Sequence, residues 1–220
     1  GLPDSVTMFI DYPTRYDNRD TERALKGSGI SCPSLPTYAG TIWDYWERNL
    51  DPDLFIDHSL EGNVKGKIVL ITGASSGIGK HSAIRLAEAG AHVLLVARSA
   101  EKLQETAQEI ADLGGISTIY QGDVSDLDDV ERLVAEVLKD HGYIDILLNN
   151  AGRSIRRSIE LSFDRFHDFQ RTMQINYFGA IKLICGFGPS MLERKSGHII
   201  NMSSISALTP SPRFSAYVAS

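Results

Sequence analysis

Short apolar runs alternate with longer amphipathic segments from Lys67 to the end of the chain. Each run is rich in β-branched residues and has the length of a buried strand. The five runs are "KIVLITG" (67–73), "AHVLLVAR" (91–98), "ISTIYQGDV" (116–124), "IDILLNNAG" (144–152) and "HIINMSS" (198–204). Strands that alternate with helices are typical of βαβ units. The pattern therefore predicts an α/β fold around a parallel sheet.

The intervening segments carry helix boundary signals. Ser99 can cap one helix, and Gly114 follows its last apolar position. Ser125 and Asp128 resemble a capping box at the start of the most amphipathic segment, which Gly142 closes. The inward positions of that segment are Val130, Leu133, Val134, Val137 and Leu138. We expect these residues to pack on the sheet.

The first 62 residues differ from the rest. They hold five of the eight prolines and show no sustained apolar period. Trp43, Trp46 and Leu50 are the exception, because their spacing places them on one helical face. That helix would either pack on the main domain or bind a neighbouring domain or subunit. We predict an N-terminal extension or interdomain linker at 1–62 and a folded domain at 63–220.

Charge and composition exclude several classes of partner. The net charge of −6 argues against binding through nucleic-acid phosphates. No apolar run approaches the roughly 20 residues that a membrane span needs. Cys32 and Cys185 lie far apart without metal-ligand spacing, so we expect reduced thiols, no metal site and a cytoplasmic location.

The stretch "TGASSGIG" (72–79) lies between the first predicted strand and the next helix. Glycines permit a tight turn there, and a helix N-terminus offers N–H groups to a pyrophosphate. The motif therefore favours a dinucleotide. The same letters also fit G-x-S-x-G, the turn that presents a nucleophilic serine, here Ser75, in hydrolases. No suitably placed acid and histidine follow in order, which disfavours a hydrolase.

Five motifs occur together in one order. "TGASSGIG" is followed by "GDV" (122–124), "NNAG" (149–152), "QINYFG" (174–179) and "SGHIINMSS" (196–204), and Tyr217 lies thirteen residues after Ser204. From about Lys65 to Ser220 the chain resembles the short-chain dehydrogenase/reductase family. The resemblance implies a Rossmann-type doubly wound parallel sheet with three α/β/α layers.

The resemblance also implies residue roles. Cofactor-binding positions would be Gly73, Ser75, Ser76, Gly77, Ile78 and Gly79 around the phosphates, Asp123 and Val124 at the adenine, and Asn150, Ala151 and Gly152 beside its ribose. The catalytic positions would be Asn176, Ser204 and Tyr217. Ser204 would hold the substrate oxygen while Tyr217 protonates it. In the family a lysine four residues after the tyrosine assists the phenol, and this chain ends at Ser220. We therefore expect the 220-residue form to be a truncated domain without turnover.

The second predicted strand ends with Ala97 and Arg98, where NAD-binding relatives place an acidic residue. A guanidinium in place of a carboxylate favours the 2′-phosphate of NADP(H). The stretches "YWERNLDPDLF" (45–55) and "LVARSAEKL" (95–103) resemble bacterial fatty acyl-CoA and fatty aldehyde reductases. We expect NADPH-dependent reduction of such a carbonyl substrate by a homo-oligomer or by part of a longer multidomain chain. The alternatives are a reductase of a ketone, steroid or 3-oxoacyl compound, and an inactive nucleotide-binding module.

Overall fold

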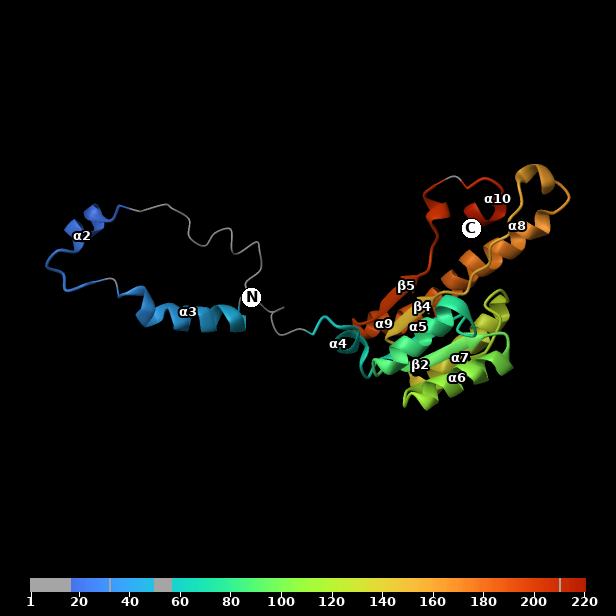
Figure 1. Ribbon diagram of the computed structural model, residues 1–220, viewed down its shortest axis with the longest axis horizontal. Coiled ribbons are helices and arrows are strands. Elements are labelled where there is room, and N and C mark those ends of the chain that lie inside the picture. Colours follow the sequence, from blue (N-terminus) through green and yellow to red (C-terminus); the bar gives the residue numbers. More distant parts are fainter. Residues whose placement is uncertain (1–16, 32, 50–56, 210) are drawn as a thin grey trace. The chain divides into compact units, whose positions relative to one another are not determined.

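The computed structural model describes residues 17–31, 33–49, 57–209 and 211–220. Its internal contacts divide the chain into a unit at Gly1–Ile56 and a unit at Asp57–Ser220 (Figure 1). The first unit contains the helices α2 (Arg19–Leu25) and α3 (Leu35–Asn49). The second contains a sheet and the other helices.

A parallel five-stranded sheet forms the centre of the second unit, in the order β3-β2-β1-β4-β5. The strands are β1 (Ile68–Thr72), β2 (His92–Ala97), β3 (Ile116–Gln121), β4 (Ile146–Asn149) and β5 (His198–Asn201). All five predicted strands are therefore confirmed. The chain moves outward from β1 to β3 and then returns to the other side of β1, so the order reverses between β1 and β4. The carboxyl ends of strands at such a reversal are where doubly wound proteins bind ligands.

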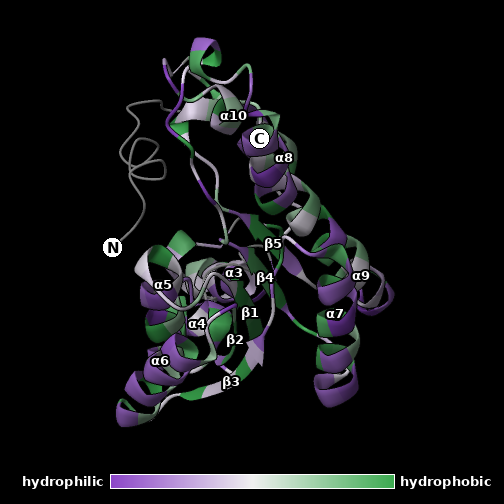
Figure 2. Cartoon of the chain, turned by 90° about the vertical axis from the view of Figure 1, so that its right-hand side faces the viewer, coloured by the Kyte–Doolittle hydropathy of each residue, from purple (hydrophilic) through white to green (hydrophobic). Residues whose placement is uncertain are grey.

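Helices cover both faces of this sheet (Figure 2). One face carries α5 (Gly77–Glu88) and α6 (Ala100–Asp112), and the other carries α7 (Leu127–His141) and α9 (Gly179–Arg194). The short helix α4 (Leu60–Val64) precedes β1, and α8 (Phe166–Met173) and α10 (Ser215–Val218) pack on each other beyond the sheet. A π-helical turn, Gln174–Phe178, joins α8 to α9. Short 3-10 turns lie at Ile159–Leu161 and Ile205–Ala207. The three layers agree with the doubly wound α/β/α prediction.

Successive side chains of β1 pack into two separate hydrophobic cores, one on each face of the sheet. Val69 and Ile71 pack with residues of α5 and α6, whereas Leu70 packs with residues of α7 and α9. Side chains of neighbouring strand positions point to opposite faces, so a strand covered on both sides must be apolar throughout. This explains why the strand sequences are uninterrupted apolar runs.

Two predicted helix caps have different outcomes. Ser99 is the N-cap of α6 and accepts a hydrogen bond from the Lys102 N–H, as expected. The prediction that Ser125 caps α7 is wrong. Asp126 is the N-cap and accepts from the N–H groups of Asp128 and Asp129. The Ser125 hydroxyl is used elsewhere, because it donates to the Asp123 carboxylate at 2.6 Å.

The aromatic helix of the first unit, α3, begins at Leu35 and ends at Asn49. The rings of Trp43 and Trp46 are 5.3 Å apart, and the Trp43 indole donates to Glu47 at 2.7 Å. Leu50 and Cys32 lie outside the described residues. The proposed packing of this helix on the main domain remains a prediction.

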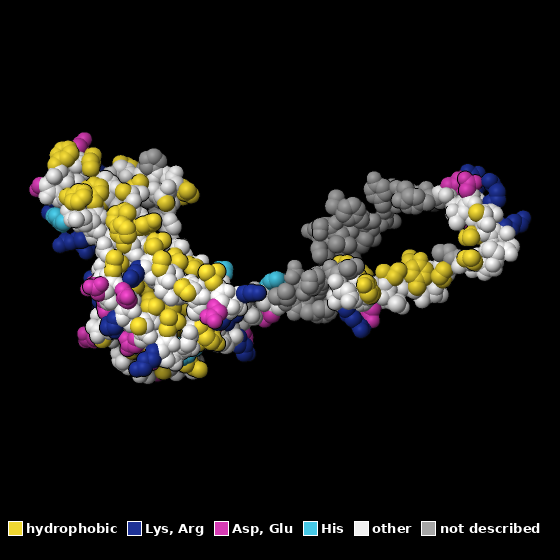
Figure 3. All heavy atoms as spheres, turned by 180° about the vertical axis from the view of Figure 1, so that it is seen from behind, with side chains coloured by type: hydrophobic (Ala, Val, Ile, Leu, Met, Phe, Trp, Pro, Cys, Tyr) yellow, Lys and Arg dark blue, Asp and Glu magenta, His cyan; other side chains and the backbone are white. Residues whose placement is uncertain are grey.

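Hydrophobic side chains gather on one surface of the second unit (Figure 3). On the π-helical turn and α9, Tyr177, Phe178, Ile181 and Leu192 are all exposed. Apolar surface of this kind is common where protein copies associate. The expected homo-oligomer stays a prediction.

Candidate active site

Thr72 joins the two strands at the reversal of the sheet. Its hydroxyl, at the end of β1, accepts from the N–H groups of Asn150 and Ala151 at 3.0 and 2.9 Å. In return, the Asn150 side chain donates to the Thr72 carbonyl at 2.9 Å. These bonds hold the "NNAG" turn after β4 against the glycine turn after β1. Both predicted nucleotide-binding turns therefore meet at one edge of the sheet.

Glycine is needed at the three positions of the first turn for different structural reasons. Gly73 has a φ of +69°, and a Cβ there would lie 3.0 Å from the Asn150 side-chain nitrogen. A Cβ on Gly79 would overlap the Gly73 carbonyl, so α5 can approach the turn only without a side chain at that position. Gly77 has a φ of +54° but faces open space. Gly73 and Gly79 are thus required for close packing, whereas Gly77 leaves room for a ligand.

The N-terminus of α5 suits the phosphates of a dinucleotide. Its N-cap, Ser76, makes no side-chain cap, so the first N–H groups are not satisfied by a capping hydroxyl. Ser76 and Ile78 are exposed there, and Ser75 is half-buried. An uncapped helix N-terminus that opens onto a glycine turn favours a bound anion. In the described part of the chain, no side chain hydrogen-bonds the Ser75 hydroxyl, so the geometry gives no support to a hydrolase.

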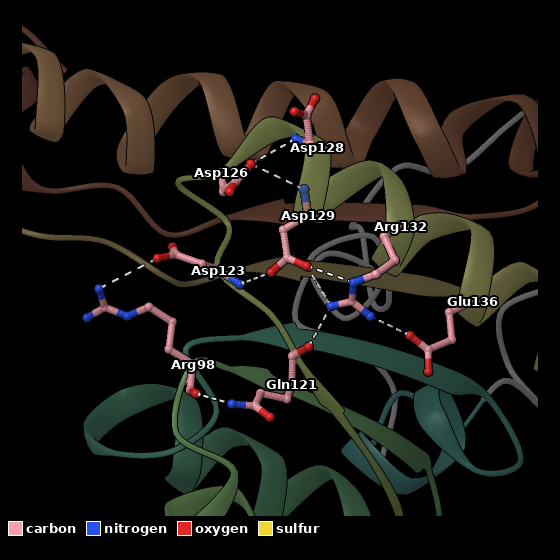
Figure 4. Close-up of polar contacts among 8 residues, drawn as sticks. All are labelled: Arg98, Gln121, Asp123, Asp126, Asp128, Asp129, Arg132 and Glu136. Carbon is pink, nitrogen blue, oxygen red and sulfur yellow. Dashed lines mark hydrogen bonds and ion pairs between the residues drawn. The ribbon is translucent and has the colours of Figure 1, made fainter.

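A shallow pocket of about 570 Å³ lies at the ends of β2 and β3. Arg98 and Asp123 line it, and the Arg98 Nη1 is 3.8 Å from the Asp123 Oδ2 (Figure 4). The Arg98 side chain is 71% exposed. An exposed guanidinium at the end of the second strand fits an additional phosphate on the adenine ribose. This pocket and the glycine turn together therefore fit NADP(H).

Asp129, on α7, holds the loop that contains Asp123. Its carboxylate accepts from the Asp123 N–H at 2.6 Å, and Arg132 donates to the same carboxylate at 2.8 Å (Figure 4). These two contacts, the N–H of Asp123 first, hold the pKa of Asp129 below its ordinary value. Arg132 also donates to Glu136 and to the Gln121 carbonyl. Since Arg132 is fully engaged, Arg98 is the more available cation for a phosphate.

A second pocket, of about 530 Å³, contains the predicted catalytic residues. Seven of the predicted site residues line it: Ile78, Asn150, Ala151, Gly152, Asn176, Ser204 and Tyr217. Gly73, Ser75, Ser76, Gly77, Gly79 and Val124 line neither of these two pockets. Val124 instead belongs to the hydrophobic core, so its predicted contact with adenine stays a prediction.

Asn176 lies in the π-helical turn between α8 and α9. Its side-chain oxygen accepts from the Arg153 N–H at 2.8 Å, and its nitrogen donates to the Arg153 carbonyl and to the Ser220 hydroxyl at 3.0 and 2.8 Å. Gly152 approaches closely, because a Cβ there would be 3.4 Å from the Asn176 oxygen. Asn176 therefore connects the "NNAG" turn to the end of α10. Single π-helical turns inside helices frequently occur at functional sites.

Ser204 and Tyr217 reach the pocket from different elements. Ser204 follows β5, and its hydroxyl accepts from the Ser206 N–H at 3.2 Å. Tyr217 lies on the short helix α10 and is half-buried. A hydroxyl and a phenol in one pocket supply an oxygen-binding donor and a proton donor.

The sequence interpretation missed most of the apolar wall of this pocket. The additional lining residues include Tyr177, Ala180, Ile181, Ile184, Met202 and Val218. Ala180, Ile181 and Ile184 follow the "QINYFG" motif at helical spacing, which was the one available signal. Their side chains form an apolar patch in a pocket that asparagine and serine side chains also line.

The described residues contain no group of three His, Cys, Asp or Glu side chains arranged to hold a metal ion. None of the described helices has the length and hydropathy needed to cross a membrane.

Comparisons with known proteins agree with this geometry. The profile of the short chain dehydrogenase family matches residues 67–220. An uncharacterized oxidoreductase of Mycobacterium tuberculosis is 52% identical over 190 residues, covering 85% of this chain and 55% of that protein. A fatty acyl-CoA reductase of Acinetobacter baylyi is 55% identical over 158 residues, covering 72% of this chain and 54% of that protein. The chain thus spans about half the length of the curated relatives it matches.

A solved structure shows the same fold. It is a metagenomic short-chain oxidoreductase in complex with NADP, which has a TM-score of 0.67 and 34% identity and covers 71% of this chain and 70% of its own. The region that matches the family profile, residues 67–220, contains both pockets and all five strands. The chain belongs to the short-chain dehydrogenase family of oxidoreductases.

Proposed function

We propose that this domain reduces a carbonyl group to an alcohol with NADPH, and that its substrate is a long-chain fatty aldehyde or fatty acyl-CoA. The observation that carries the proposal is the second pocket, which brings Ser204, Tyr217 and Asn176 together beside the "NNAG" turn. The pocket adjoins the glycine turn through the Thr72 and Asn150 hydrogen bonds. A carbonyl substrate and a nicotinamide cofactor would meet there.

The residues have complementary roles in this reaction. NADPH, when bound, would supply one hydride to the carbonyl carbon of an aldehyde. An acyl-CoA would need two NADPH: the first hydride gives the aldehyde with release of the CoA thiol, and the second gives the alcohol. The Ser204 hydroxyl donates a hydrogen bond to the carbonyl oxygen, on which negative charge develops, and the Tyr217 phenol delivers the proton to that oxygen. Asn176 holds the Arg153 backbone and the end of α10 in place.

Three features support NADP(H) as the cofactor. The α5 N-terminus and the open side of Gly77 fit the pyrophosphate. Arg98 fits the 2′-phosphate, since it is exposed and lines the first pocket. A structural relative at 34% identity was solved in complex with NADP.

Two features support a long-chain substrate. The pocket wall includes Ala180, Ile181, Ile184 and Met202, which suit an alkyl chain better than a sugar. A relative at 55% identity is a fatty acyl-CoA reductase. We further propose that the protein acts in the cytoplasm as a homo-oligomer or within a longer multidomain chain.

Because the chain spans about half the length of its curated relatives, the test uses a longer chain of their length. NADPH oxidation would be followed with a long-chain aldehyde, the matching acyl-CoA, a cyclic ketone and a 3-oxoacyl thioester. We expect kcat/KM to be highest for the aldehyde or the acyl-CoA. A ketone, steroid or 3-oxoacyl preference would replace the substrate assignment, and no turnover of any carbonyl would favour an inactive nucleotide-binding module. Ester hydrolysis without nucleotide would restore the hydrolase interpretation.

A further inference from the structure

Asp168, on α8, is a buried carboxylate outside the catalytic pocket. Its side chain is only 6% exposed, yet three basic side chains contact it. The Nε atoms of Arg157 and Arg165 donate to its Oδ2 at 3.2 and 3.0 Å, and the His167 Nε2 is 3.2 Å from its Oδ1. Burying a carboxylate is costly unless it is paired, so loss of one of these partners would destabilise this cluster.

One of these partners also contacts the segment that carries Tyr217. The Arg157 carbonyl accepts from both the backbone N–H and the hydroxyl of Ser215, at 3.3 and 3.0 Å. Ser215 is the first residue of α10, and Arg157 pairs with Phe214 in an isolated parallel bridge. A continuous set of contacts therefore runs from Asp168 through Arg157 to the helix that presents the phenol.

The helix α10 depends on contacts with other elements for its position. It is four residues long, below the length at which a helix is stable by itself. It packs against α8 and lies beside it in both ribbon views (Figures 1 and 2). Its orientation must therefore come from tertiary contacts. At its start these are the bonds of Ser215 to the Arg157 carbonyl, along its length the contacts with α8 and the 3-10 turn Ile205–Ala207, and just past its end the bond from Asn176 to the Ser220 hydroxyl.

We propose that Asp168 and Arg157 are positioning residues for Tyr217. The carboxylate of Asp168, on α8, holds the Arg157 side chain, and the Arg157 carbonyl holds the start of α10. The inference rests on the proposed catalytic role of Tyr217. It adds two residues that touch neither the pocket nor the cofactor region. Because a misplacement of about 1 Å can cost about a hundredfold in rate, loss of this connection would lower kcat.

Arg165 provides a matched control within the same cluster. Its side chain is 37% exposed, against 35% for Arg157, and it contacts the same carboxylate oxygen. Arg165 makes no hydrogen bond to α10 in the described part of the chain. Both Arg157→Leu and Arg165→Leu remove one guanidinium from Asp168, but only the first loosens the connection to Ser215.

The experiment compares these two variants in the longer chain with NADPH and a long-chain aldehyde. We expect Arg157→Leu to lower kcat by about tenfold or more, with an unchanged Kd for NADPH, and Arg165→Leu to stay within about twofold of the parent. Arg157→Lys, which keeps the charge, should recover part of the loss. Equal kcat values for the two leucine variants would overturn the inference, even if both lower the melting temperature.

A double-mutant cycle provides a second, independent test. Asp168→Asn should lower kcat in the parent but add little in the Arg157→Leu background, because both changes interrupt one connection. Additive losses would contradict the inference. If Asp168→Asn does not fold, the comparison of the two arginines decides alone. Tyr217→Phe separates the two claims: full activity in that variant would refute the proposed function, whereas inactivity beside a fully active Arg157→Leu would refute only the positioning role.

Discussion

Replacing Arg98 with alanine tests the cofactor assignment most sharply among the nucleotide-binding residues. The guanidinium lies at the end of β2, lines the first pocket and is 71% exposed. We expect the unmodified chain to bind NADPH more tightly than NADH, and Arg98→Ala to lose most of this difference. The reason is that the two cofactors differ only in the 2′-phosphate that Arg98 would contact.

The magnitude follows from two opposing contributions. Hydrogen bonds to charged groups contribute about 1.5 to 3 kcal/mol. Arg98 must first leave Asp123, whose Oδ2 is 3.8 Å away. An exposed ion pair of that kind is worth about 0.2 to 1 kcal/mol. The net preference is then about 0.5 to 2.8 kcal/mol, which corresponds to about two- to a hundredfold in Kd.

The assay is a fluorescence titration of NADPH and NADH into both proteins at fixed ionic strength. Arg85→Ala is the matched control, because Arg85 is 76% exposed and lies 3.9 Å from a carboxylate, Glu88, but lines neither pocket. The control should keep the full preference. Equal affinities in the unmodified chain, or an undiminished preference in Arg98→Ala, would refute the assignment.

Three further outcomes are expected. Gly79→Ala should cost about 3 kcal/mol of unfolding free energy, because its Cβ overlaps the Gly73 carbonyl, whereas Gly77→Ala should cost only about 1 kcal/mol; urea unfolding distinguishes them. Arg165 and its neighbours lower the pKa of Asp168, so the ionised carboxylate should stabilise the fold fully above about pH 4. This stabilisation should disappear as the pH falls through the lowered pKa, and Asp168→Asn should make the free energy of unfolding depend less on pH in that range. Deleting residues 1–56, which leaves α4 and its Ser59 cap intact, should lower the melting temperature if the Trp43 helix packs on the domain, and an unchanged melting curve would exclude that packing.

The strands and the nucleotide-binding edge could be predicted because their signals are local. A strand covered on both faces must be apolar along its whole length, which marked all five runs. The glycine turn and the "NNAG" turn follow β1 and β4, and parallel strands bring such turns together at one edge. The Thr72 hydroxyl completes that arrangement in the structure.

Other features depend on contacts between distant residues. The N-cap of α7 is Asp126 rather than Ser125, because Ser125 bonds Asp123 instead. The π-helical turn around Asn176 has no local sequence signal. The contact of Arg157 with Ser215 joins residues 58 positions apart, so a pattern read along the chain could not reveal it.

The most direct test of the proposed reductase is Tyr217→Phe in the longer chain, which removes the phenol oxygen from α10 and leaves the ring. Hydride transfer from NADPH to a long-chain aldehyde would be measured in a single turnover, with the Kd for NADPH determined in parallel. We predict a fall of about a hundredfold or more in the transfer rate at an unchanged Kd. A transfer rate equal to that of the parent would contradict the assignment of Tyr217 as the proton donor.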